Sequence, residues 1–357
     1  MNLLLAINSS AGTGHDLSLG EELVRILHKR LGLGHSINLI RAESHKEIKE
    51  RSRTFTEQHP SDTVIIAGGG GGTLRAVIEG VGESAKNRTL PGAEQLRIGA
   101  LRMGSGNVIA RQLGIARNPR DGVEELAAQM LAKATANCCV IGCDTGDDSP
   151  PIYGATLGGF GLFGHVPKRL ETYHEARPRL HRLSAGLLGI EHLTNLEYGL
   201  CLSGLCGKTA LQPKQLDLIE VSQGDRSEQF PLLAGALMNF PLGALPFQTN
   251  VSVEDAELSL HLVPYRSRIQ ALGLVLNAKA NAQEARQFSI TEEAPVVMRV
   301  LNREHMQFFI DEDPVEARKV TLRVAGHLAF VPGKNLNKSN NNRKRKRNGT
   351  TCKCNRN

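Results

Sequence analysis

Residues 64–75 read Val-Ile-Ile-Ala-Gly-Gly-Gly-Gly-Gly-Thr-Leu-Arg, so an apolar run leads directly into five consecutive glycines. A buried strand that passes through glycines into a helix is the usual arrangement of a phosphate-binding turn. Glycine lets the backbone approach an anion closely, and the free N–H groups of the next helix point toward that anion. This stretch therefore predicts a strand, a phosphate-binding turn and then a helix.

The sequence around this stretch alternates between strands and helices up to residue 135. Apolar runs predict strands at 2–7, 37–40, 63–67 and 98–101, and periodic or capped segments predict helices at 17–31, 44–58, 73–81 and 108–113. Strands separated by helices of this size imply a parallel sheet with right-handed crossovers. In such a sheet ligands bind beyond the carboxyl ends of the strands, where we expect the turns at 8–12, 68–72 and 104–106.

Short β-type segments, separated by Gly, Pro and Asp clusters, dominate after residue 138. They predict strands at 138–143, 153–159, 196–202, 216–221, 232–238, 258–263, 296–301, 306–311 and 320–325, with a helical insert at 165–188. The pattern is typical of an antiparallel sandwich or barrel-like domain. We therefore expect an α/β domain at 1–135, a β-rich domain at 136–332 and a tail at 333–357.

The composition narrows the class of protein. A chain of 357 residues suggests two domains rather than one core. No apolar stretch reaches the ~20 residues that a membrane-spanning helix needs, and the N-terminal segment lacks the basic region of a signal peptide. Seven cysteines, spread thinly along the chain, favour reduced thiols over a disulfide framework. These features predict a cytoplasmic protein.

The basic character of the chain belongs to its tail. Residues 334–357 carry nine Lys or Arg and no Asp or Glu, whereas the remainder has 34 basic and 36 acidic residues. A charged segment without apolar periodicity is expected to be disordered. Its charge predicts either peripheral contact with an anionic membrane or a solvated tail with no specific partner. Nucleic acid is the rival partner of a basic tail, but we expect no specific nucleic-acid binding.

Three turns, taken together and in order, resemble the catalytic domain of the diacylglycerol kinase family, which includes sphingoid-base kinases and bacterial lipid kinases. The family opens with an Asn-Pro-x-x-Gly-like turn, and this chain has Asn8-Ser-Ser-Ala-Gly12. The nucleotide signature Gly-Gly-Asp-Gly-Thr corresponds here to Gly69-Gly-Gly-Gly-Thr73. The signature Pro-x-Gly-Thr-x-Asn corresponds to Arg102-Met-Gly-Ser-Gly-Asn107. The resemblance extends over nearly all of residues 1–332 and implies an α/β domain similar to that of NAD kinases and phosphofructokinases.

The resemblance implies a nucleotide site at the glycine turns, with ATP and Mg²⁺ as cofactors. Backbone N–H groups of the turn would hold the ATP phosphates, and hydroxyls would add hydrogen bonds. Two asparagines would bind nucleotide or hold the turns. The residues concerned are Asn8, Gly69, Gly70, Gly71, Gly72, Thr73, Ser105 and Asn107.

Two further segments acquire roles from the resemblance. The family sequence Asp-Gly-Glu-Pro corresponds to Asp311-Glu-Asp-Pro314, so Asp311 or Asp313 would be the general base that accepts the proton of a lipid hydroxyl. The alternative reading of this segment is a polar β-turn. Asp255 aligns with a family position that binds a structural Mg²⁺, and a plain turn is an equal alternative because Ala256 replaces the usual glycine.

One departure from the family pattern leads to two hypotheses about function. Gly71 stands where the family has Asp, whose carboxylate helps to organise Mg²⁺ and phosphate charge. The first hypothesis is an ATP-dependent lipid kinase that phosphorylates the hydroxyl of a lipid alcohol, such as diacylglycerol or a sphingoid base. The alternative is a catalytically impaired nucleotide- or lipid-binding protein of the same fold.

Overall fold

The structure is a computed structural model. It describes residues 1–9, 16–85, 90–92, 94–104, 107–146, 150–176, 190–240, 247, 251, 255–276, 283–311 and 313–334. The chain divides into two units that are not contiguous in sequence. Unit 1 comprises residues 1–77, 91–136 and 329–357, and unit 2 comprises residues 78–90 and 137–328. The domains expected from the sequence were contiguous, whereas here the chain leaves unit 1 and later returns to it.

Unit 1 is built on a parallel sheet, as the sequence predicts. Its elements are β1 (Asn2–Asn8), α1 (Leu17–Leu31), β2 (Ser36–Ala42), α2 (His45–Gln58), β3 (Thr63–Gly69), α3 (Gly71–Ser84, which continues into unit 2), β4 (Leu96–Arg102), α4 (Val108–Gln112) and α5 (Pro119–Leu131). The strand order is β4-β3-β1-β2, with every pair parallel. The helix α5 is the one element of this region that we did not predict.

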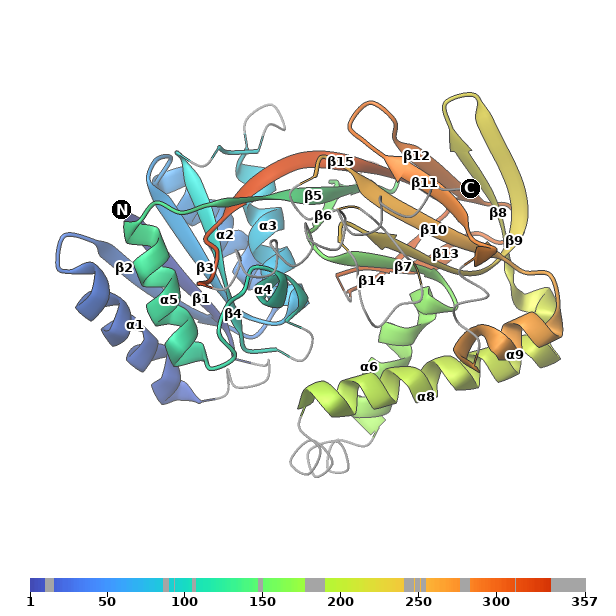
Figure 1. The fold of residues 1–357 in the computed structure, drawn as a ribbon, viewed down its shortest axis with the longest axis horizontal. Helices are drawn as coiled ribbons and strands as arrows, with labels where there is room; N and C mark the ends of the chain where they lie inside the picture. Colours follow the sequence, from blue (N-terminus) through green and yellow to red (C-terminus); the bar gives the residue numbers. More distant parts are fainter. Residues whose placement is uncertain are drawn as a thin grey trace, which may run out of the picture. The chain divides into compact units, whose positions relative to one another are not determined.

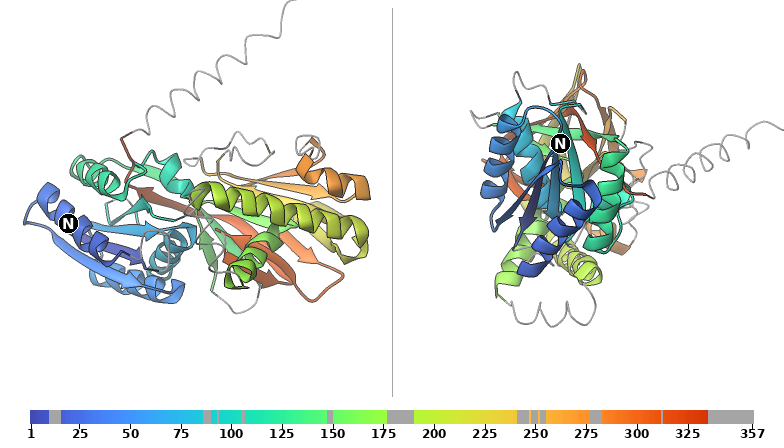
Figure 2. Two further views of the ribbon diagram at one scale, coloured as in Figure 1. Left: turned by 90° about the horizontal axis from the view of Figure 1, so that it is seen from below. Right: turned by 90° about the vertical axis from the view of Figure 1, so that its left-hand side faces the viewer.

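Helices cover both faces of this sheet. Figure 2 (right) shows α1 and α5 on one side of the strands, and α2 with the beginning of α3 on the other. The central strands are accordingly buried along both faces, with Leu3–Ile7 and Val64–Ala67 at most 2% exposed. The predicted capping box at the start of α2 is confirmed in part, because the Glu47 N–H donates to Ser44 Oγ at 3.2 Å.

Unit 2 is mainly antiparallel, which agrees with the predicted second fold class. Its elements are β5 (Ala136–Asp144), β6 (Ile152–Gly154), β7 (Leu157–Gly161), η3 (Phe163–His165), α6 (Val166–Ala176), α8 (Ile190–Leu211), η4 (Pro213–Gln215), β8 (Asp217–Gln223), β9 (Arg226–Met238), β10 (Leu258–Pro264), α9 (Arg268–Leu276), β11 (Arg286–Ile290), β12 (Val296–Val300), β13 (Met306–Ile310), β14 (Asp313–Ala317) and β15 (Lys319–Phe330). The strand order is β14-β13-β7-β9-β8-β12-β15; β10 joins β9 to β11, and β5 joins β15 to β6 (Figure 1).

One predicted strand is wrong. Residues 196–202 belong to the helix α8 and not to a β-strand. Apolar residues alternate within this seven-residue segment, as in a strand. The helix is favoured by a longer apolar stripe, in which Leu205, Cys206 and Ala210 are buried at helical spacing. These side chains pack in one cluster with residues of β9 and α9, and α9 runs beside α8 in Figure 1. Burial of that stripe therefore overrode the local alternation.

The predicted helical insert at 165–188 is confirmed over Val166–Ala176, and its remainder from residue 177 lies outside the described residues. The basic tail lies outside them from residue 335 onward. None of the helices in the described part of the chain combines the length and the apolar character needed to cross a bilayer.

The last strand completes the sheet of unit 1. Residues Ala329 and Phe330 at the end of β15 pair in parallel with Arg97 and Ile98 of β4. The Val331 N–H then donates to the Ile98 carbonyl at 2.8 Å. The strand β4 is therefore bonded on both sides, to β3 and to the end of β15.

Candidate functional site

The predicted turns of unit 1 meet at the carboxyl edge of its parallel sheet. Ile7 of β1 lies in register with Gly68 of β3, and Gly69 lies in register with Arg102 of β4. Asn8 ends β1, so it lies at the same edge as the glycines that end β3. Arg102 was quoted only as part of a motif, but its position brings a cationic residue to this edge. This is the part of a parallel sheet at which ligands bind.

The two glycine turns lie against each other. A Cβ placed on Gly104 would lie 2.2 Å from Gly70 Cα and 2.6 Å from Gly70 N. Such distances are far below van der Waals contact, so only glycine fits at residue 104. A Cβ on Gly70 would meet Gly104 Cα at 3.6 Å, which is an ordinary contact. Residue 104 is thus held to glycine by packing, whereas residue 70 is not.

Asn107 holds the second turn closed. The Gly104 N–H donates to Asn107 Oδ1 at 3.0 Å, and Asn107 Nδ2 donates back to the Gly104 carbonyl. Asn107 takes a left-handed conformation, with φ of 48°, which asparagine tolerates better than most residues. Both ends of its amide are used on the turn, so of the two predicted roles for Asn107 the structure supports holding the turn.

The first turn ends at the N-terminus of α3. The helix begins at Gly71, and its first intrahelical donor is the Leu74 N–H, which bonds to the Gly70 carbonyl at 3.2 Å. The N–H groups of Gly71, Gly72 and Thr73 consequently have no intrahelical acceptor. The predicted helix start at Thr73 was two residues late, and this difference brings two glycines into the first helical turn.

The hydroxyl of Thr73 is a buried polar group at this edge. The Thr73 side chain is 2% exposed and packs on Gly69, and its hydroxyl has no hydrogen-bond partner among the described residues. A buried hydroxyl without a partner costs about 1–3 kcal/mol. Together with the N–H groups beside it, this hydroxyl forms a set of donors suited to phosphate oxygens.

The donor set at this edge does not supply the carboxylates that Mg²⁺ prefers. Gly71 offers no side chain, and no group of three or more His, Cys, Asp or Glu residues suited to a metal occurs in the described part of the chain. Asp255, the predicted metal ligand, is exposed, and residues 252–254 before it lie outside the described residues. Ser105 and the Ser10–Gly12 part of the first motif also lie outside them.

The predicted base Asp311 lies in unit 2 and is fully buried. Its carboxylate accepts backbone N–H bonds from Ala155 at 2.7 Å, Thr156 at 2.8 Å and Leu157 at 3.1 Å, and a further bond from the Thr156 hydroxyl. Asp311 itself takes a left-handed φ of 51°. The side chain thereby ties the turn after β13 to the loop between β6 and β7.

Burial raises the pKa of Asp311, although its four hydrogen bonds act in the opposite direction. A carboxylate that is fully buried and accepts four hydrogen bonds is occupied in maintaining the loop. Asp313 is half-buried and begins β14, two residues further along. Of the two candidates for a general base, Asp313 is thus the more accessible, and the carboxylate of Asp311 is occupied by the loop.

Two residues that support this loop were missed by the sequence analysis. Asn239 is fully buried and donates from Nδ2 to the carbonyls of Ala155 at 2.7 Å and Cys139 at 3.2 Å. Thr156 contributes the hydroxyl bond to Asp311. A lone asparagine after a strand and a threonine in a loop are common in any sequence, so nothing in the linear pattern distinguishes them.

Comparison with known proteins shows what the N-terminal part of this chain is similar to. Residues 2–138 match the family model described as the diacylglycerol kinase catalytic domain. This match confirms the resemblance that the glycine turns indicated. Residues 2–138 are thus similar in sequence to the catalytic domain of a kinase family. Among curated proteins none matches the chain in sequence.

Solved structures share the fold of both units. A diacylglycerol kinase from Bacillus anthracis str. Sterne is 12% identical and superposes with a TM-score of 0.58, covering 94% of this chain and 98% of that one. Two further structures from that organism are assigned provisionally to the diacylglycerol kinases by their descriptions. They give TM-scores of 0.61 at 13% and 14% identity, covering 93% and 94% of this chain and 98% of theirs. At such identities the likeness shows the fold alone.

Proposed function

We propose that this protein is an ATP-dependent lipid kinase, which transfers the γ-phosphoryl group of ATP to the hydroxyl of a lipid alcohol. The observation that carries the proposal is the buried Thr73 hydroxyl without a partner, beside the first N–H groups of α3. A polar group that the fold leaves unsatisfied is typical of a ligand site. The match of residues 2–138 to a kinase catalytic domain supports phosphoryl transfer as the reaction.

The nucleotide would bind at the carboxyl edge of unit 1. The N–H groups of Gly71, Gly72 and Thr73 would donate to its phosphate oxygens, and the Thr73 hydroxyl would donate one more bond. Gly70 and Gly104 would let the phosphates approach the backbone closely. Because Gly71 supplies no carboxylate, Mg²⁺ would have to be held mainly by the phosphates that it accompanies.

The acceptor would be activated in unit 2. Asp313 would take the proton of the lipid hydroxyl as the hydroxyl oxygen bonds to the γ-phosphorus and the bond to ADP breaks. Asp311 would act through the backbone, because it holds the turn that carries Asp313. Phosphoryl transfer requires mainly positioning of the nucleophile and neutralisation of phosphate charge, and Asp313 would contribute to the first of these.

A second function is supported by Gly71. The loss of a carboxylate that positions Mg²⁺, the ion that neutralises phosphate charge, would cost orders of magnitude in rate if nothing replaces it. A protein of this fold that binds nucleotide or lipid without transferring phosphate is therefore the alternative. Peripheral contact of the basic tail with an anionic membrane is a separate prediction for either function.

The test is transfer of radioactive phosphate from ATP by the full-length protein to diacylglycerol, sphingosine or phosphatidylglycerol. Wild type, Gly71→Asp and Asp313→Asn are compared, with nucleotide affinity measured by calorimetry for each. Transfer by wild type that Asp313→Asn abolishes, while ATP still binds, supports the kinase. Transfer that appears or rises only with Gly71→Asp indicates an impaired kinase. If all three proteins bind ATP and none transfers phosphate to any lipid, the binding protein is the correct reading.

A further inference from the structure

Unit 2 contains a small cavity, with apolar and polar side chains in its wall, that the proposed reaction does not use. It has a volume of about 230 Å³ and lies between η3, the end of α8, η4 and the strands β8 and β9. Polar side chains at its wall are His165, Lys208, Thr209, Gln215, Asp217 and Arg303. Drug-sized ligands occupy ~300–1,000 Å³, so this cavity suits a smaller molecule or one polar group of a larger one.

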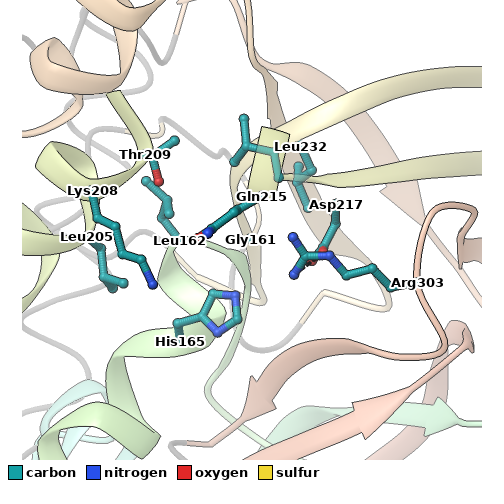
Figure 3. A pocket seen from close by; sticks show the side chains of 11 residues that line it. Gly161, Leu162, His165, Leu205, Lys208, Thr209, Gln215, Asp217, Leu232 and Arg303 are labelled. Carbon is teal, nitrogen blue, oxygen red and sulfur yellow. Dashed lines mark ion pairs between the residues drawn. The ribbon is translucent and has the colours of Figure 1, made fainter. Parts of the chain in front are cut away.

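Two cationic side chains and a histidine converge on this cavity. Figure 3 shows Lys208 ending on the side of the His165 ring, and Arg303 entering from the opposite side with its guanidinium beside Asp217. The three residues come from α8, from the turn after β12 and from η3, so tertiary structure brings them together. His165 Nδ1 bonds to Gln307 Oε1 at 2.8 Å, which leaves Nε2 for a ligand.

One buried carboxylate lies among these cations. Asp217 is 5% exposed, and its Oδ1 lies 3.2 Å from Arg303 Nη1. This contact is an ion pair without a well-directed N–H bond, and Oδ1 accepts no hydrogen bond within the described chain. Asp217 therefore offsets the charge of Arg303 and still has an acceptor oxygen for a ligand donor such as a hydroxyl.

The charge that remains at the cavity is positive. With Asp217 offsetting the charge of Arg303, the charge of Lys208 is left over for a ligand among the described residues of the cavity wall. Glu316, another carboxylate near His165, is paired with Lys168 at 2.9 Å. A ligand that satisfies the cavity carries an anionic group for the cations and a hydroxyl for the carboxylate.

The cavity is separate from the Asp311 loop. Strand β7 begins at Leu157, whose N–H bonds to Asp311, and ends at Gly161, which lines the cavity. The four residue steps between them correspond to about 13 Å along the strand. A molecule in the cavity therefore occupies a site of its own within unit 2.

We propose that this cavity binds a phosphomonoester on a hydroxyl-bearing carrier, of which glycerol 3-phosphate is the simplest example. Lys208 and the N–H groups of Arg303 that Asp217 leaves unused bind the phosphate, and Asp217 and His165 Nε2 accept hydrogen bonds from the carrier hydroxyls. The same chemistry occurs in a free metabolite and in the headgroup of a phosphorylated lipid.

The experiment measures binding of glycerol 3-phosphate to the full-length protein by calorimetry. Wild type is compared with Lys208→Gln, which removes a cavity cation, and with Lys214→Gln, an exposed lysine of η4 outside the cavity wall. Saturable binding that Lys208→Gln weakens about tenfold, while Lys214→Gln leaves it unchanged, is the expected result; this factor is typical for loss of one charge-assisted hydrogen bond. Circular dichroism checks that both variants are folded.

Three results would overturn the proposal: no saturable binding, equal affinity of wild type and Lys208→Gln, or equally tight binding of glycerol without phosphate. Because the glycine edge of unit 1 is another place for phosphate, the Lys208 and Lys214 comparison separates the two sites whatever the outcome of the kinase assay. Flotation with phosphatidylcholine vesicles, with and without phosphatidic acid, identifies the source. Binding that needs phosphatidic acid and Lys208 assigns the cavity to a lipid headgroup, and binding of the soluble probe alone assigns it to a metabolite.

Discussion

Gly104 and Gly70 approach each other so closely that a Cβ on Gly104 would lie 2.2 Å from Gly70 Cα. The contact is asymmetric, because a Cβ on Gly70 would meet Gly104 Cα at 3.6 Å. One turn therefore rests on the other, and the position of the first helical turn of α3 depends on the absence of a side chain at residue 104.

Gly104→Ala is expected to push the two turns apart. Overpacking of this kind costs about 1–3 kcal/mol of unfolding free energy, and ATP affinity should fall because the N–H groups move. Gly70→Ala is the matched control and should change the unfolding free energy by less than ~0.5 kcal/mol. Urea unfolding and calorimetry with ATP measure both effects. Equal stability of the two variants would contradict this account of the contact.

Asn107→Gly tests the two hydrogen bonds by which Asn107 closes the second turn. It does not strain the backbone, since glycine accepts the left-handed φ that Asn107 adopts. It removes both hydrogen bonds to Gly104, at about 1 kcal/mol each. We expect ATP to bind about tenfold more weakly. Asn118→Gly is the control, because Asn118 caps α5 in the same unit through the Arg120 N–H at 2.9 Å. Weakened ATP binding in the control as well would attribute the effect to general loosening of unit 1.

Asp311→Asn and Asp313→Asn should separate a structural role from a catalytic one. Asparagine at 311 turns one acceptor oxygen into a donor among N–H groups, so we expect a loss of about 2–3 kcal/mol in unfolding free energy. Asparagine at 313 should leave the unfolding free energy nearly unchanged and lower kcat strongly. Chemical denaturation and phosphate-transfer rates measure the pair. A stable Asp311→Asn protein with normal turnover would show that the loop does not need its tether.

Thr73→Val should have opposite effects on stability and on nucleotide binding. Valine has nearly the same shape and removes a buried hydroxyl that has no partner in the described chain, so the free energy of unfolding should stay constant or rise by about 1 kcal/mol. ATP affinity should fall, because a phosphate oxygen loses its donor. Thr73→Ser, which keeps the hydroxyl, should bind ATP as wild type does. If Thr73→Val binds ATP normally, the hydroxyl does not face the phosphates.

The sequence predicted unit 1 well, because its signals are local and agree with one another. The run Val64–Ala67 is buried on both faces, and the glycines after it end the strand where the pattern placed the turn. The helix α8 was missed over residues 196–202, because a seven-residue window shows alternation while the buried stripe extends over the longer helix. Local windows therefore fail where burial is decided by distant packing partners.

The sequence predicted the motifs of the candidate site, but it did not predict the contacts that each residue of the site makes. Asp311 and Asp313 cannot be distinguished by residue type. Only the structure shows that the carboxylate of Asp311 accepts backbone hydrogen bonds from the loop at 155–157. The cavity residues His165, Lys208 and Arg303 are separated by long stretches of sequence, so no motif could have joined them. Long-range contacts of this kind become visible only when the chain is folded.

The pairing of β15 with β4 determines how late in synthesis the sheet of unit 1 can be completed. The segment that matches the kinase family, residues 2–138, leaves the ribosome with one edge of β4 unpaired, because its partner residues Ala329 and Phe330 are synthesised almost two hundred residues later. Most of unit 2, residues 137–328, is made in that interval. A fragment that ends at residue 138 would keep an exposed strand edge, which is a template for aggregation. Unit 1 is therefore a split domain, whose sheet is completed only after synthesis of the segment inserted in it.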